Sequence, residues 1–72
     1  MGAERQVIHL SPRHRQIVEL VAKGWSYPKV AKRLGIKHET VRAHIRVISK
    51  RLGSDDPPRV AMCDYYLRQP RT

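Results

Sequence analysis

The chain has 72 residues, and its 15 lysines and arginines against 6 aspartates and glutamates give a formal net charge of +9 at pH 7. This length allows one domain with a small core and no sizeable substrate cavity. No apolar run reaches the ~18–20 residues that span a bilayer, and a single cysteine, Cys63, excludes an internal disulfide. The charge favours a polyanionic partner, but composition does not separate nucleic acid from an anionic membrane.

Most of the surplus charge lies in one segment. Between Ser26 and Gly53 there are eight basic residues against one acid, Glu39, so these 28 residues carry +7 of the +9. A run of charge is often only a solvated face. The arrangement of the charges within this segment therefore decides its meaning.

The first two helices are predicted from their caps. Ser11 before Pro12 is a hydroxyl N-cap followed by a proline at the first helical position, which predicts a helix over 12–23. Ser26 is a second N-cap, and the short helix after it is expected to end at Leu34. A glycine follows each of these helices, and glycine readily adopts the left-handed conformation that ends a helix.

The third helix is predicted over 38–52, and it has two different faces. With a rotation of about 100° per residue, one side of the helix holds an apolar stripe made of Val41, Ile45, Ile48 and Leu52. The opposite side holds Arg42, Ala43, Arg46 and Lys50. The small core needs the apolar stripe, so we interpret the helix as a core element with a basic outer face rather than as a membrane-surface helix.

A fourth helix is predicted after the polar, acidic break at 54–58. Asp55 or Asp56 is expected to cap this helix, with Pro57 and Pro58 in its first turn. Its apolar groups surround the helix rather than forming one narrow stripe, and they are Val60, Ala61, Cys63, Tyr65, Tyr66 and Leu67.

These elements predict an all-α domain over 10–68, with a flexible N-terminal arm over 1–9 and a C-terminal tail over 69–72. Within the domain, four residues stand at the spacing of a helix-turn-helix: Ala31, Gly35, Ile36 and Val41. The small residue lets the two helices cross closely, the glycine makes the turn, and the two branched residues pin the second helix onto the first. Because the second helix of such a motif enters the major groove, its basic outer face favours double-stranded DNA as the partner.

Six short runs along the chain point to a known family. They are Leu10-Ser11-Pro12-Arg13, Val21-Ala22-Lys23-Gly24, Val30-Ala31, Leu34-Gly35-Ile36, Thr40-Val41-Arg42-Ala43-His44 and Arg51-Leu52-Gly53. In this order they resemble the LuxR/FixJ-type (GerE-like) helix-turn-helix domain, and the resemblance covers about Leu10 to Leu67. It implies a four-helix DNA-binding fold of the LuxR/FixJ C-terminal type, whose second and third helices form the helix-turn-helix and whose fourth commonly makes the dimer contact.

The resemblance also implies roles for individual residues. The base-reading residues are Arg42, Ala43 and Arg46. Arginine suits this role because it can donate two hydrogen bonds to guanine, and alanine can meet a thymine methyl group. The residues best placed for phosphates, which fix the register, are Ser26, Lys29, Lys37, Thr40, Lys50 and Arg51. The residues implied at a dimer contact are Val60, Ala61, Asp64 and Tyr65.

Three positions depart from the pattern of the family. His14 stands where the family usually has a glutamate, which removes the capping box of the first helix. Lys29 replaces a common glutamate, and Lys37 replaces a common hydroxyl cap on the third helix. The two lysines add positive charge where a phosphate backbone would lie. We expect His44, on the flank of the apolar stripe, to be packed and hydrogen-bonded.

We therefore expect sequence-specific binding of double-stranded DNA in transcriptional regulation, with no catalysis, cofactor or metal. The expected location is the cytoplasm of a prokaryotic cell or a phage-infected host, at the nucleoid. Further candidate partners are RNA polymerase and a second copy of the chain, bound through the fourth helix at least on DNA. No membrane partner is expected. A small protein-interaction adaptor of the transcription machinery and a DNA architectural protein without sequence choice stay open as alternatives. Since the family's domain usually follows a receiver or ligand-binding domain, the chain is either an excised domain or a free-standing small regulator.

Overall fold

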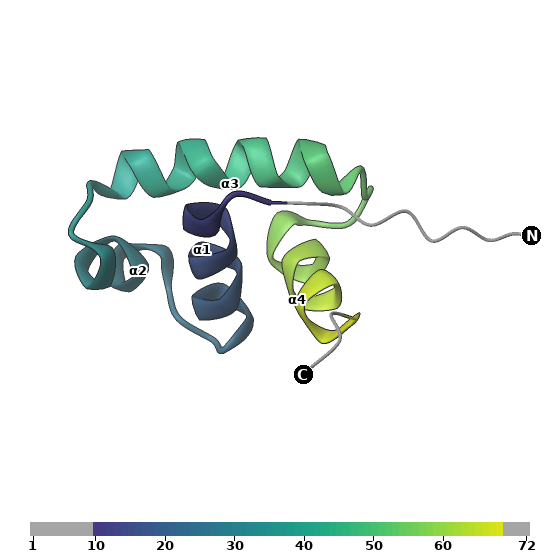
Figure 1. Ribbon diagram of the computed structural model, residues 1–72, viewed down its shortest axis with the longest axis horizontal. Coiled ribbons are helices and arrows are strands. Elements are labelled where there is room, and N and C mark those ends of the chain that lie inside the picture. The colour runs from purple at the N-terminus through teal and green to yellow at the C-terminus, as the bar shows by residue number, and fades with distance from the viewer. Residues whose placement is uncertain (1–9, 69–72) are drawn as a thin grey trace, which may run out of the picture.

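The computed structural model describes residues 10–68 of the protein. These residues form four helices, α1 (Pro12–Ala22), α2 (Tyr27–Leu34), α3 (His38–Leu52) and α4 (Pro58–Arg68), as Figure 1 shows. They contain no strand, so the predicted all-α, four-helix fold is confirmed. The expected arm and tail, 1–9 and 69–72, lie outside the described residues.

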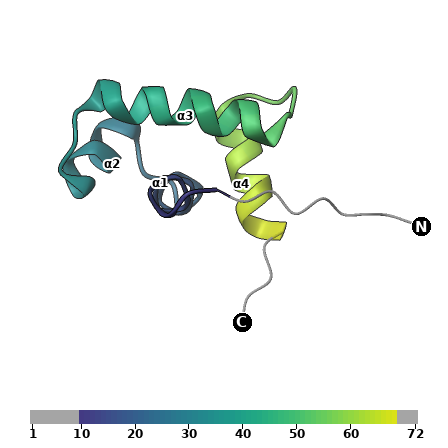
Figure 2. The same ribbon diagram turned by 45° about the horizontal axis from the view of Figure 1, so that its top comes forward.

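The longest helix, α3, lies across the other three. Both views show α1 between α2 and α4, with all three on the same side of α3 (Figures 1 and 2). α3 packs against α2, α4 and α1, and α1 also packs against α4. No described helix lies over the other side of α3. Among the described helices, none combines the length and the hydropathy needed to cross a bilayer.

The helices begin and end largely where the sequence predicts. Ser11 and Ser26 each accept a hydrogen bond through Oγ from the backbone N–H three residues on, at 3.2 and 3.4 Å. Lys37, at the N-cap of α3, makes no such side-chain bond, as its departure from the family pattern implies. α1 ends one residue earlier than predicted, because Lys23 has left the helical backbone range with φ −83° and ψ 2°.

The start of α4 differs from the prediction. The helix begins at Pro58, and Pro57 precedes it and accepts the first helical hydrogen bond, from the N–H of Ala61 at 3.0 Å. The expected aspartate cap does not form. The carboxylate of Asp56 instead accepts a hydrogen bond from the hydroxyl of Ser54, at 3.2 Å. This local bond within the break replaces the cap.

The core is a cluster of buried apolar residues from all four helices and from the residue that precedes the N-cap of α1. Its members are Leu10, Ile17, Val18, Val21, Val30, Ala31, Val41, Ile45, Ile48 and Met62. Three of the four residues predicted on the stripe of α3 are buried, while Leu52 is half-buried against the cluster. Met62 is fully buried, which the sequence did not indicate. Trp25 and Tyr27 pack against the cluster.

Arg59, near the start of α4, ties α4 to the turn between α1 and α2. Its Nη1 donates to the carbonyl oxygen of Val21 at 3.3 Å, and its Nη2 donates to that of Trp25 at 3.1 Å. Its guanidinium carbon also lies 5.1 Å from the centroid of the Tyr27 ring. A guanidinium holds its donors in a rigid planar fork, so one side chain can bind both carbonyls while it stacks on the ring.

We expect Arg59→Ala to lower the free energy of unfolding by about 2 kcal/mol, because two hydrogen bonds from a charged donor and a cation–π contact are lost. Arg59→Lys should recover little of this, since one ammonium group cannot reproduce the fork. Urea unfolding followed by circular dichroism measures both losses. The control is Arg68→Ala, which breaks an exposed ion pair of 3.2 Å with Asp64 and should cost less than about 1 kcal/mol. Equal losses at the two arginines would contradict the assignment.

Candidate nucleic-acid interface

The candidate site is the side of α3 that faces away from the other helices. The core residues of α3 are Val41, Ile45 and Ile48. Its exposed residues include Glu39, Thr40, Arg42, Ala43, Arg46, Val47, Lys50 and Arg51. All three residues predicted to read bases are therefore accessible. A helix with one uncovered side fits the major groove of B-DNA, which is about 12 Å wide.

The exposed residues differ in their position around α3. Glu39, Ala43, Arg46, Val47 and Lys50 lie within about 60° of the direction opposite the core stripe, by the rotation of about 100° per residue. Arg42 and Arg51 lie about 90° from that direction, on opposite edges of the face. The predicted base readers therefore occupy the centre and one edge of the face. Glu39 places one carboxylate at its centre.

The residues predicted to contact phosphates lie at helix ends. Lys37 and Thr40 are at the start of α3, and Lys50 and Arg51 are at its end, so these four flank the predicted base-reading residues. The other two, Ser26 and Lys29, lie at the start of the neighbouring helix α2. All six are exposed. The start of α3 also presents free backbone N–H groups, and the starts of α2 and α3 both carry the positive end of a helix dipole; both features attract phosphate.

The basic side chains of this surface are not neutralised within the domain. The ion pairs of the described residues join Lys23 to Glu19 and Arg68 to Asp64, and none of these residues belongs to α3. No hydrogen bond or ion pair of the described residues holds the side chain of Arg42, Arg46 or Lys50. These three cations are therefore free to bind an anion.

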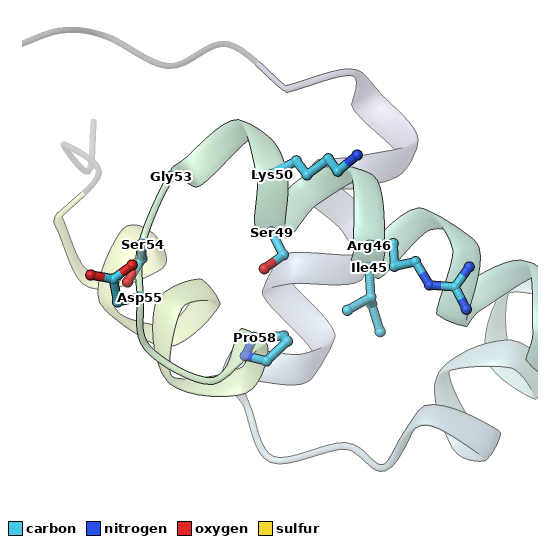
Figure 3. A pocket seen from close by; sticks show the side chains of 8 residues that line it. All are labelled: Ile45, Arg46, Ser49, Lys50, Gly53, Ser54, Asp55 and Pro58. Carbon is cyan, nitrogen blue, oxygen red and sulfur yellow. The ribbon is translucent and has the colours of Figure 1, made fainter.

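A hollow of about 500 Å³ opens beside the C-terminal half of α3. It is lined by Ile45, Arg46, Ser49, Lys50, Gly53, Ser54, Asp55 and Pro58. Figure 3 shows Arg46 and Lys50 extending from α3 away from the loop residues Ser54 and Asp55. The loop thus leaves both basic side chains unhindered. The described part of the chain holds no group of three or more metal-ligating side chains, here or elsewhere.

Two of the four residues implied at a dimer contact are accessible on α4. Val60 is 50% exposed and Asp64 is exposed, whereas Ala61 is buried and Tyr65 is half-buried against the core. The side chain of Ala61 thus faces the core, where a partner cannot reach it. Leu67 is 74% exposed and lies on the same face as Val60, two turns further on. The spacing of seven residues was the sequence signal for this face.

His44 joins α3 to α1. Its Nδ1 lies 3.1 Å from Nε2 of His14, and the two rings meet edge to face with their centroids 5.0 Å apart. One ring donates and the other accepts, so at least one of the two must be neutral. Burial, and after it the nearby His44 and Arg51, lowers the pKa of His14 below its ordinary value of 6.5. The expectation that His44 is packed and hydrogen-bonded is confirmed.

Comparison with known proteins identifies a family to which the chain is similar. The family described as "Bacterial regulatory proteins, luxR family" matches residues 8–63. The chain is 39% identical over 49 residues to the nitrate/nitrite response regulator protein NarL of Escherichia coli strain K12, and equally to that of Escherichia coli O6:H1. The aligned part makes up 68% of this chain and 23% of each relative, so the chain spans about a quarter of their length. No solved structure gives a significant match.

We expect the domain to lose stability as the pH falls below about 6.5, the ordinary pKa of histidine. The pKa of His14 is below 6.5 in the folded state, so the unfolded chain binds more protons in the window below pH 6.5. The stabilisation is thus present above pH 6.5 and is lost as the pH falls through the folded pKa. Urea unfolding at several pH values measures the slope.

Two glutamine substitutions separate this pair from the other histidines. His14→Gln should flatten the decrease in stability, because it removes the titrating ring and keeps a hydrogen-bonding group. His38→Gln is the matched control, since His38 is exposed and should leave the slope unchanged. A wild-type slope in His14→Gln would contradict the role of the pair.

Proposed function

The chain belongs to the luxR family of bacterial regulatory proteins, and from that premise we propose how it acts on DNA. Its function is sequence-specific DNA binding in the regulation of transcription. The observation that carries the mechanism is the uncovered, basic side of α3, which lies opposite its buried stripe and follows α2 in a helix-turn-helix. We propose that this side enters the major groove and that α2 rests above the backbone.

Arg42, Ala43 and Arg46 are the residues we propose to read bases. Each arginine can donate two hydrogen bonds to O6 and N7 of a guanine, and the methyl group of alanine can contact that of a thymine. Arg46 lies nearer the centre of the face than Arg42, so it has the more direct approach to the groove floor. The absence of bonds from both guanidinium groups to the described residues supports this role.

The phosphate contacts are proposed at the ends of the helices. Lys37 and Thr40 flank the base readers on one side, and Lys50 and Arg51 flank them on the other. On α2, the hydroxyl oxygen of Ser26 accepts a hydrogen bond from the backbone N–H of Lys29 at 3.4 Å. The hydroxyl proton is therefore available to donate a hydrogen bond to a phosphate oxygen. The ammonium of Lys29 lies on the same helix end. These contacts would fix the register of α3 and carry no sequence information.

A homodimer on DNA is proposed through the exposed face of α4, made of Val60, Asp64 and Leu67. This helix lies on the side of α1 away from α2 and beneath α3 (Figure 1). A partner bound there would leave the outer side of α3 free for the groove. The two exposed aliphatic residues, 50% and 74% accessible, support an apolar contact.

The wider setting is proposed from the class of regulator. We propose a binding role without a catalytic step, in the cytoplasm of a prokaryotic cell or a phage-infected host, where the DNA of the nucleoid lies. RNA polymerase is a proposed partner without an assigned surface, because a regulator on DNA commonly acts on it. The similar proteins are nitrate/nitrite response regulators, but the match covers 23% of each. The similarity to them therefore supports the class of regulator and not the signal.

Selection of bound sequences from random duplexes tests the function directly. Recovery of one preferred site supports sequence-specific binding, and an inverted repeat supports two-fold assembly. Binding without a preferred site would favour a DNA architectural protein. If no duplex binds at low salt and a protein copurifies, the small adaptor of the transcription machinery is favoured instead.

We expect Arg42→Ala and Arg46→Ala each to cost about 1–3 kcal/mol on the selected site, because each removes a bidentate contact to guanine. Both should cost much less on random duplex. Lys50→Ala should weaken both duplexes alike and should reduce the salt dependence of log K by about 0.9. Titrations at several salt concentrations measure these effects. Equal losses of the three variants on both duplexes would contradict the assigned roles.

We expect Leu67→Asp to weaken binding to an inverted repeat by about tenfold or more, since burial of a leucine contributes about 1.5–3 kcal/mol. Binding to a single half-site should not change. The half-buried Cys63 of α4 gives a second readout, because a short bismaleimide should cross-link two copies on the repeat and not on the half-site. Glu19→Gln, on the exposed side of α1, is the control. Unchanged cross-linking in Leu67→Asp would contradict the α4 interface.

A further inference from the structure

Val47 is an exposed aliphatic residue on the DNA-facing side of α3. It is 44% exposed, whereas the other large apolar residues of this helix are buried or half-buried. Valine is among the residue types most often found inside a protein. Val47 does not pack against the core cluster, so core packing does not explain a valine at this position.

The position of Val47 relates it to a predicted base reader. It follows Ala43 by four residues, so the two side chains lie on the same face, one turn and about 6 Å apart along the helix. Together they form a short apolar strip. The basic residues Arg46 and Lys50 lie on one side of this strip and Arg51 on the other, by the rotation of about 100° per residue.

The occupant of this strip must combine two properties. It must bear dense negative charge to satisfy the unpaired cations around the strip, and it must also present an apolar group to the strip itself. In the major groove of B-DNA the apolar group of this kind is the C5-methyl of thymine. A partner protein is a less suitable occupant of the strip. The other exposed aliphatic residues, Val60 and Leu67, lie on α4, beneath α3 (Figure 1), and so do not extend the strip into a larger apolar surface.

We propose that Val47 is a specificity-determining residue that selects thymine through contact with its C5-methyl group. This inference rests on the proposed function and adds a fourth base-reading residue to Arg42, Ala43 and Arg46. Since Val47 lies one turn beyond Ala43, it reads a different base. The binding site of the domain therefore contains a thymine whose methyl group contributes to affinity through Val47.

Substitution of deoxyuridine for single thymines in the selected site tests the proposal. Uracil lacks only the methyl group and keeps the hydrogen-bonding groups of thymine. Loss of one buried methyl is worth about 0.8 kcal/mol, so one substitution should weaken the wild-type domain about fourfold. Thymines outside the bound site provide the control on the DNA, and their substitution should have no effect.

Variants of Val47 identify the residue that reads the methyl group. Val47→Ser removes both methyl groups of the side chain and leaves a small hydroxyl, so it should bind thymine and uracil equally at that position. Val47→Ile keeps an aliphatic contact and should retain the roughly fourfold preference. Both variants should match the wild type in thermal unfolding and in low-salt affinity for random duplex, because neither changes the core or the charge.

The results separate this inference from the proposed function. Equal wild-type binding of thymine and uracil at every position overturns the inference and leaves sequence-specific binding intact. If every methyl preference of the wild type persists unchanged in Val47→Ser, the inference is also overturned, because other residues then read the methyl groups. If no duplex is bound at low salt, both the proposed function and the inference fail.

Discussion

Three aliphatic side chains, Val41, Ile45 and Ile48, hold α3 against the other helices, and this one-sided burial determines the rest of the molecule. They are 5% exposed or less, and their spacing leaves the opposite side of the helix to water. No polar or charged residue is buried among those the structure describes, so the cations of α3 are all displaced to that free side. The packing that stabilises the domain therefore also orients its charge.

The turn between α2 and α3 fixes the direction in which α3 leaves the core. Gly35 ends α2 with a φ of 70°, in the left-handed region that favours glycine. The N–H of Ile36 then donates to the carbonyl of Ala31 at 3.0 Å, and the Ile36 side chain packs against the core. A bulkier residue at Ala31, which is 5% exposed, would push α2 away from α3. A local backbone requirement and a small side chain thus set the direction of α3, and with it the orientation of the proposed DNA-binding side.

The sequence predicted α3 well because a strong apolar stripe, a basic opposite face and a terminal glycine all indicated the same helix. It predicted α4 less well, because apolar residues surround that helix and no stripe separates the buried Met62 from the exposed Leu67. Arg59 was not predictable from local pattern, since its partners are backbone carbonyls 34 and 38 residues away. Val47 was not predicted as a site residue, because a valine on an amphipathic helix is usually buried, and its exposure in the fold reveals it.

The same features that suit the domain to DNA limit its stability without DNA. A core of this size is marginal, and a large net charge destabilises a compact state through self-repulsion. The unpaired cations lie close together on one face of α3, and Arg51 approaches the His14–His44 pair that joins α3 to α1. A phosphate backbone on this face would relieve the repulsion, and binding to the folded state raises its stability. Binding of DNA to α3 would therefore also stabilise the folded domain.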